Sequence, residues 1–246
     1  MPTLVRTELL ALRTTRLPWV LLAGTVLLTT VLAVNAVLDA GTKDSPSIGT
    51  AGAMLAVLGA AGRGNLVILL LGVLTVTAEF RHGTVTATFL HTPRRIRVLA
   101  AKAAAIVVLA TIAAAADLGV ALAVGFATGA LPPALLNPDI VLHVAGLLLA
   151  YPLYGLIGVA AGALIVYQPV AVLLPITWVL YLEDFTLSLV PESVVPWSLK
   201  GVTAALAHSG TLPDVLPVAV GGAVLAAYGL LLFSAGAVRL AHRDIT

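Results

Sequence analysis

The chain has 246 residues, of which 60% are hydrophobic and only 10% are charged. Soluble proteins carry about 25% charged residues, so this composition excludes a soluble enzyme, a disordered chain and a nucleic-acid-binding domain. The net charge is +2, and the absence of cysteine excludes disulfides and cysteine-ligated metals. What remains is an integral membrane protein with little mass outside the bilayer.

Residues 1–16 precede the long apolar segments and have modest amphipathicity. Six longer apolar segments follow, and a helix that crosses the hydrocarbon core needs about 20 such residues. The second segment begins somewhere between Ala51 and Asn65, and the break at 167–169 separates the fourth from the fifth. The expected spans are residues 17–38, 60–78, 103–128, 139–166, 170–190 and 215–238. Residues 197–207 are too short to span and predict an interfacial or re-entrant helix.

The distribution of lysine and arginine sets the expected orientation. Ten of the thirteen basic residues fall in residues 1–17, residues 79–102 and the C-terminal tail, and such residues concentrate on the cytoplasmic side. Both termini are therefore expected in the cytoplasm, as an even number of spans requires. Lys43, Arg63 and Lys200 fall on the other side. The prediction is an all-α membrane protein of one domain, residues 1–246, with the 197–207 helix outside.

No catalytic motif is visible in the sequence. It contains no G-x-x-x-x-G-K-[ST] phosphate loop, no H-E-x-x-H pair and no G-x-S-x-G elbow. We therefore expect neither an enzyme nor a metal site, and no cofactor in this chain. Any energy for transport would come from a partner protein or from an ion gradient.

The stretch from Glu79 to Ala105 has the most distinctive pattern. Gly83-Thr84 interrupts the apolar rhythm where the second span meets water, and the residues beyond have the spacing of a short surface helix. Thr92-Pro93 is typical of an N-cap followed by the first helical residue. Four basic residues near the start of the third span are expected to hold it at the anionic inner surface: Arg94, Arg95, Arg97 and Lys102.

This pattern, a carboxylate at the end of a span, then Gly-Thr, an amphipathic segment and T-P-R-R, resembles the first cytoplasmic loop of ABC-2 type ABC-transporter permeases. The resemblance covers residues 70–105 and the tail 239–246, and the six-span layout fits it. It implies a coupling helix that docks on a separate ATPase. Residues 1–16 would be the connecting helix, and 197–207 the short external helices. The implied coupling residues are Glu79, Phe80, Arg81, Gly83, Thr84 and Phe89.

The resemblance also implies partners. Two permease chains, as a homodimer or heterodimer, would work with two ATPase chains, and ATP and magnesium would bind to the ATPases. The chain would form half of an export pathway in a bacterial plasma membrane, in contact with membrane lipid and not with nucleic acid. Spans two and five line the central interface in this family, which marks possible pathway residues by analogy: Thr75, Thr77, Thr177, Trp178 and Tyr181.

Three polar residues lie inside or at the edge of the apolar spans. Asp117 has a depth in the third span similar to that of Tyr151 in the fourth, and we expect a hydrogen bond between helices there. The alternative is a proton or cation relay at Asp117, which would fit an ion-coupled secondary transporter. Arg63 is expected to reach the outer head groups. Gly158-x-x-x-Gly162 predicts close packing of helices within the chain. A membrane scaffold without transport is the remaining alternative.

Overall fold

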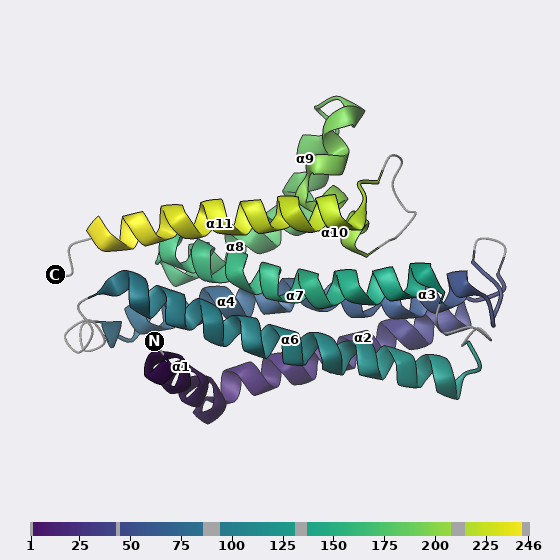
Figure 1. The fold of residues 1–246 in the computed structure, drawn as a ribbon, viewed down its shortest axis with the longest axis horizontal. Helices are drawn as coiled ribbons and strands as arrows, with labels where there is room; N and C mark the ends of the chain where they lie inside the picture. The colour runs from purple at the N-terminus through teal and green to yellow at the C-terminus, as the bar shows by residue number, and fades with distance from the viewer. Residues whose placement is uncertain (1, 43–44, 86–93, 131–136, 208–214, 243–246) are drawn as a thin grey trace.

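The computed structural model describes residues 2–42, 45–85, 94–130, 137–207 and 215–242, and in these residues the regular structure is entirely helical. Six helices are long and apolar enough to cross a membrane, as the sequence predicts. They run side by side in an elongated bundle (Figure 1). The protein therefore has the architecture of a multi-pass membrane protein.

The first four spans are nearly continuous helices. The first is α2 (Arg16–Leu38). The second combines α3 (Ala51–Gly59), a 3₁₀ turn at Ala61–Arg63 and α4 (Gly64–Arg81). The third is α6 (Arg95–Ala127), and the fourth is α7 (Pro138–Ile165). The third helix begins at Arg95 rather than near residue 103, because the basic residues before the apolar run also take helical conformation.

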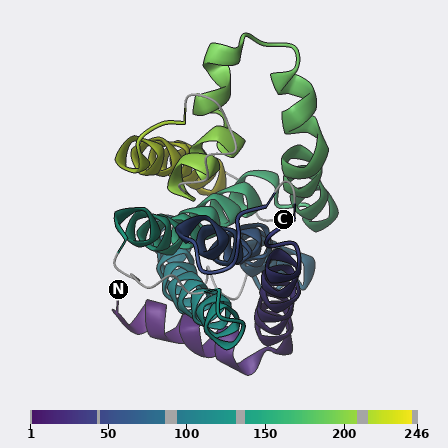
Figure 2. The same ribbon diagram turned by 90° about the vertical axis from the view of Figure 1, so that its right-hand side faces the viewer.

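The fifth span is less regular than the others. It consists of α8 (Gln168–Thr177), a π-helical turn (Trp178–Leu182) and α9 (Glu183–Leu187). Pro175 lies inside α8, and a proline removes a backbone donor from the helix that contains it. The end of this span projects away from the bundle (Figures 1 and 2). Only 17% of its most apolar window is buried within the chain.

Helix α7 lies at the centre of the bundle and packs against α4, α6 and the last span, α11 (Val218–His242). Glycines on α7 allow the close approach to α4. A Cβ added at Gly158 would lie 2.0 Å from the Leu69 carbonyl oxygen, and one at Gly162 would lie 2.8 Å from that of Val73. This confirms the prediction that the Gly158-x-x-x-Gly162 pair packs within the chain.

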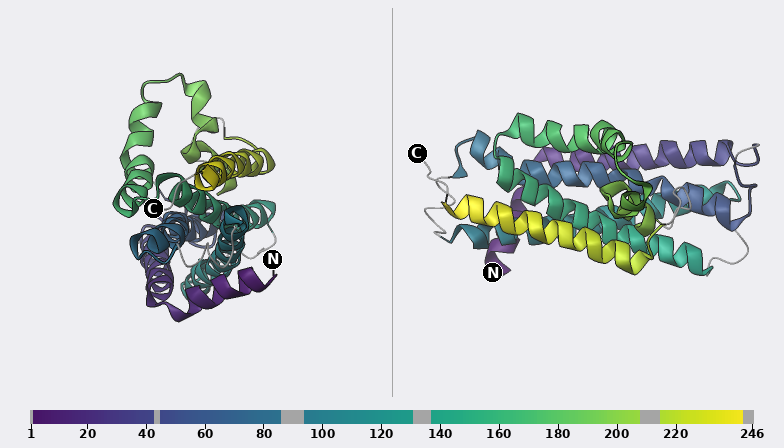
Figure 3. Two further views of the ribbon diagram at one scale, coloured as in Figure 1. Left: turned by 90° about the vertical axis from the view of Figure 1, so that its left-hand side faces the viewer. Right: turned by 90° about the horizontal axis from the view of Figure 1, so that it is seen from above.

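The two ends of the bundle differ. One end, which we call the arginine-rich end, contains Arg81, Arg94, Arg95, Arg97 and Arg239, and α1 and the C-terminal end of α11 lie there (Figures 1 and 3). Helix α1 (Pro2–Thr14) packs on the start of α6 at this end. Thr15 has extended backbone and reorients the chain between α1 and α2.

A short helical unit precedes the last span; it covers the stretch predicted from residue 197 to 207 and begins earlier, at Glu192. It consists of a 3₁₀ segment (Glu192–Trp197) and α10 (Leu199–Leu206). The Ser198 hydroxyl caps α10 by accepting a hydrogen bond from the Gly201 N–H. Val202 and Leu206 of α10 are fully buried against α7 and α11. The unit is thus packed into the bundle rather than lying free beside it.

Candidate functional site

Lys102 connects three helices at the arginine-rich end. Its ammonium lies 2.9 Å from Oε2 of Glu8 on α1 and also donates to Oε1 of Glu79 on α4. The lysine is only 5% exposed. Lys102, predicted as a membrane-surface anchor, thus has its ammonium paired with two carboxylates inside the chain. Because α6 begins at Arg95, Lys102 lies about two turns inside the helix, on the face that packs against α1 and α4.

The Glu8 carboxyl loses most of its water when α1 docks. Burial raises the pKa of Glu8 above its usual value of 4.5, and the neighbouring Lys102 ammonium opposes this rise. A raised pKa in the folded state means that the charged carboxylate is less favourable in the docked helix than in free solution. The ionisation of Glu8 therefore makes one contribution to the docking of α1, which favours docking below pH 4.5 and is lost as the pH rises through the raised pKa.

The end of α4 has the geometry of a Schellman motif, in which a glycine with positive φ closes the helix. Gly83 has a φ of +69° and its N–H donates to the Phe80 carbonyl, while the Thr84 N–H donates to the Glu79 carbonyl. This gives the physical reason why Gly83-Thr84 interrupts the apolar pattern. Phe89 lies outside the described residues, and so does Thr92-Pro93.

The arginines at the start of α6 take two different positions. Arg94 and Arg97 are exposed, as expected for residues that face lipid head groups or water. Arg95 instead donates from Nη1 to the Leu240 carbonyl of α11 at 3.0 Å. It therefore joins the first turn of α6 to the last turns of the final span.

Asp117 and Tyr151 form the hydrogen bond that the sequence predicts. The Tyr151 hydroxyl lies 2.7 Å from Oδ2 of Asp117 and also contacts the Ala61 carbonyl, so the contact joins α6, α7 and the 3₁₀ turn before α4. Asp117 and Tyr151 are both completely buried. Among the described residues, no lysine, arginine or histidine forms an ion pair with Asp117.

Gly64 leaves the space that this contact occupies. A Cβ at position 64 would lie 2.2 Å from the Tyr151 hydroxyl oxygen and 2.7 Å from Oδ2 of Asp117. We expect Gly64→Ala to destabilise the protein by about 1–3 kcal/mol through overpacking, and Gly64→Ala with Tyr151→Phe to recover part of the loss. The midpoint of thermal unfolding in detergent measures both. Gly24→Ala on α2 is the control, because no atom lies within 4 Å of its added Cβ; equal midpoints for all variants would contradict the packing argument.

The sequence analysis did not identify Asn65, which lies next to Gly64. Its side chain is 4% exposed, and neither amide atom has a hydrogen-bond partner among the described residues. The sequence does contain a signal for Asn65, because a polar residue inside an apolar span is a candidate for a functional role. Asn65 was instead interpreted only as a possible boundary of the second span.

The predicted pathway residues do not come together in one cavity of this chain. Thr77 is fully buried and its hydroxyl donates to the Val73 carbonyl, while Thr75 is half-buried. Thr177, Trp178 and Tyr181 are exposed on the outer surface of the fifth span. Arg63 is also exposed, at the junction between α3 and α4. A pathway through these residues would need a second chain against the fifth span.

The chain matches no family model and no curated protein. Its class is defined by the six membrane-spanning helices alone. Among the described residues, no group of three histidine, aspartate or glutamate side chains could hold a metal ion.

Proposed function

We propose that the chain is the membrane-spanning permease subunit of an ABC-2 type exporter in a bacterial plasma membrane. Two permease chains would form the export pathway, and two separate ATPase subunits would bind ATP and magnesium. The proposal rests on the pattern of residues 70–105 and on the six-span layout. In this arrangement the arginine-rich end faces the cytoplasm.

The contact of Lys102 with Glu8 and Glu79 is the observation that carries the proposal. Glu79 lies in the last turn of α4, directly before the segment that would dock on the ATPase. Through Lys102, this turn is joined to α6 and to the docked helix α1. A displacement of the segment by an ATPase would therefore move the ends of two spans and α1 together.

The fifth span offers a surface on which the second permease chain of the proposal could pack. Several large apolar side chains on it have no cover within the chain, including Leu173, Trp178, Tyr181 and Phe185. A second chain against this surface would enclose Thr177, Trp178 and Tyr181 at a shared interface. The pathway would then form between the two chains rather than inside one.

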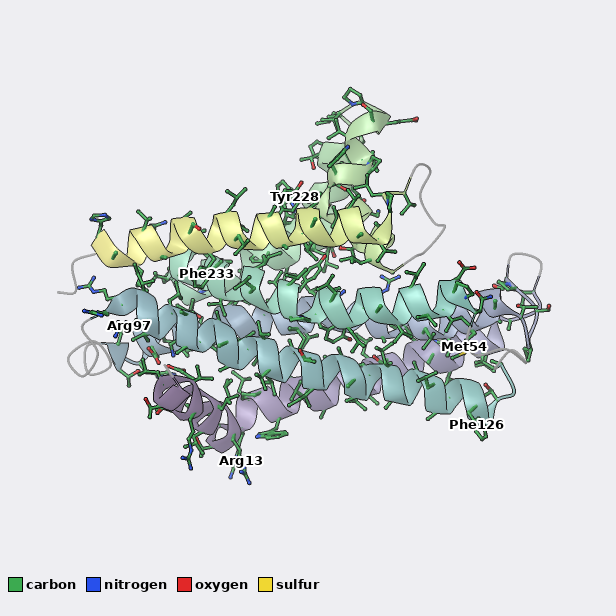
Figure 4. The ribbon with its side chains drawn as sticks, in the orientation of Figure 1. Arg13, Met54, Arg97, Phe126, Tyr228 and Phe233 are labelled. Carbon is green, nitrogen blue, oxygen red and sulfur yellow. The ribbon has the colours of Figure 1, made fainter. Side chains whose placement is uncertain are left out.

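The coupling segment provides the direct test. If it docks on an ATPase, Phe89→Ala should remove an apolar side chain worth about 1.5–3 kcal/mol and weaken recovery of the ATPase with the permease by about tenfold or more. Phe126→Ala is the matched control, because Phe126 is 78% exposed at the opposite end of the bundle (Figure 4). The measurement is co-purification with an ABC ATPase co-expressed with this chain, together with ATP hydrolysis in vesicles.

Two outcomes would contradict the proposal. Equal recovery of the ATPase with Phe89→Ala and Phe126→Ala would mean that the segment is not a docking site. Substrate export that persists without ATP but stops when the proton gradient is removed would instead identify an ion-coupled transporter.

A further inference from the structure

The corner between α7 and α8 has an unusual backbone. Val166 has φ +58° and ψ −42°, and it is the only described residue other than glycine with a positive φ. The Tyr167 N–H donates to the Ile165 carbonyl at 2.6 Å, which makes this corner a γ-turn of the strained kind. A β-branched residue in this conformation is costly, and such strain is often found at binding sites.

A cleft of about 920 Å³ lies beside this corner at the arginine-rich end. It is formed by the end of α4, the α7–α8 corner and the end of α11. Its lining residues are Phe80, Arg81, Ile165, Val166, Tyr167, Gln168, Pro169, Val172, Leu173 and Arg239.

The charges in the cleft are all of one sign. Arg81 and Arg239 contribute two guanidinium groups, and none of the described residues that line the cleft is a carboxylate. The nearest carboxylate in sequence, Glu79, is paired with Lys102 on another side of α4. The Gln168 side chain accepts a hydrogen bond from Nη1 of Arg81 at 3.2 Å. Gln168 directly follows the γ-turn, so the turn positions the side chain that holds the Arg81 guanidinium at the cleft. Paired guanidinium groups favour phosphate, which they can bind through several parallel hydrogen bonds.

The walls of the cleft favour a lipid over a soluble anion. Val172 and Leu173 are on the first turns of the fifth span, and Leu173 is 61% exposed on the surface that faces away from the bundle. The cleft therefore combines a cationic part, at the ends of the spans, with an apolar part that continues along a span. This is the distribution of polarity in a phospholipid with an anionic head group at the membrane surface.

We propose that this cleft is a binding site for one anionic phospholipid, with its phosphate between Arg81 and Arg239 and an acyl chain along Val172 and Leu173. The site shares Phe80 and Arg81 with the expected coupling residues and Leu173 with the exposed fifth span, so its test measures lipid binding and ATPase recovery separately. It differs from the surface contacts expected of Arg94 and Arg97, because it is a formed cleft with an apolar wall and a positioned guanidinium.

Native mass spectrometry of the full chain in detergent tests the proposal. Phosphatidylglycerol and phosphatidylcholine with the same acyl chains are supplied in equal amounts, and the ratio of the two bound lipids is measured. We expect the parent protein to prefer phosphatidylglycerol, and Arg81→Ala and Arg239→Ala each to lower the bound ratio by about tenfold. Arg81→Lys keeps the charge but loses the planar fork, so its ratio should fall between those of the parent and Arg81→Ala.

Arg13→Ala is the matched control. Arg13 is exposed on α1 at the same end of the bundle, away from the cleft (Figure 4), and its removal changes the net charge equally. The proposal predicts an unchanged lipid ratio for this variant. An equal loss with Arg13→Ala would show that only general surface charge attracts the lipid, and would overturn the proposal.

Three further results would also overturn it. The first is that Arg81→Ala and Arg239→Ala both keep the parent's lipid ratio, while their thermal unfolding midpoints also equal the parent's. The second is displacement of phosphatidylglycerol by millimolar glycerol phosphate, which would identify a soluble phosphate as the ligand. The third is loss of ATPase recovery in Arg81→Ala with the lipid ratio retained, which would assign the arginine to a protein partner.

Discussion

Replacing Lys102 with methionine is expected to release α1 from the bundle. The substitution leaves the carboxylates of Glu8 and Glu79 close together and partly buried, without the cation that both contact. Removal of one partner from a buried ion pair costs about 3–5 kcal/mol, and α1 has few other contacts that could offset this loss. Trypsin cleavage after Arg6 and Arg13 should become much faster, because the backbone of α1 is then free to unfold.

A rescue experiment separates this electrostatic effect from a loss of packing. Adding Glu8→Gln and Glu79→Gln to Lys102→Met removes the two charges, and trypsin resistance of α1 should return in large part. Arg97→Met, which changes an exposed cation on the same helix, is the control and should leave cleavage at the parent rate. Equal cleavage rates in Lys102→Met and Arg97→Met would mean that the contact does not hold α1.

Several glycines lie where α7 contacts α4. Among their substitutions by alanine, Gly158→Ala is expected to destabilise the protein most. The new Cβ would lie 2.0 Å from the Leu69 carbonyl oxygen, so the helix backbones would have to separate. On α4, the position of Gly72 is equally crowded, with the Gly155 carbonyl oxygen 2.5 Å from its added Cβ. We expect destabilisation of about 3 kcal/mol, measured as a thermal unfolding midpoint lower by about 10 °C.

Gly119→Ala on α6 is the control for this experiment. Its added Cβ meets no atom within 4 Å, and alanine is a better helix former than glycine by about 1 kcal/mol, so its midpoint should equal or exceed the parent's. A Gly158→Ala protein with the parent's midpoint but an altered number of chains per particle would contradict the contact with α4. Such a result would place Gly158 between chains.

The helical class and the approximate spans could be predicted from sequence, because a continuous apolar run has few other solutions in a bilayer. The contact between Asp117 and Tyr151 could also be predicted, because counting residues from the ends of two spans places the two side chains at one depth. These predictions needed only the rise of a helix and the thickness of the membrane.

The environment of Lys102 could not be predicted in this way. Hydropathy marks where the chain leaves the membrane, whereas the helix continues through Arg95, Arg97 and Lys102, since arginine, lysine and alanine are all good helix formers. The helical face on which Lys102 lies then depends on where the helix begins and on what packs beside it. The crowding at Gly64 could not be predicted for the same reason, because the atoms next to it belong to Asp117 on α6 and Tyr151 on α7.

The two-residue corner at Val166 and Tyr167 also restricts how the chain can enter the bilayer. The fifth span has the lowest mean hydropathy of the six, 1.6, against 2.0 for the fourth, and it contains a proline within α8. Since only a γ-turn separates the two spans, no linker exists that could hold one outside while the other inserts. The more apolar fourth span and the weaker fifth span must therefore be inserted together as one helical hairpin during biosynthesis.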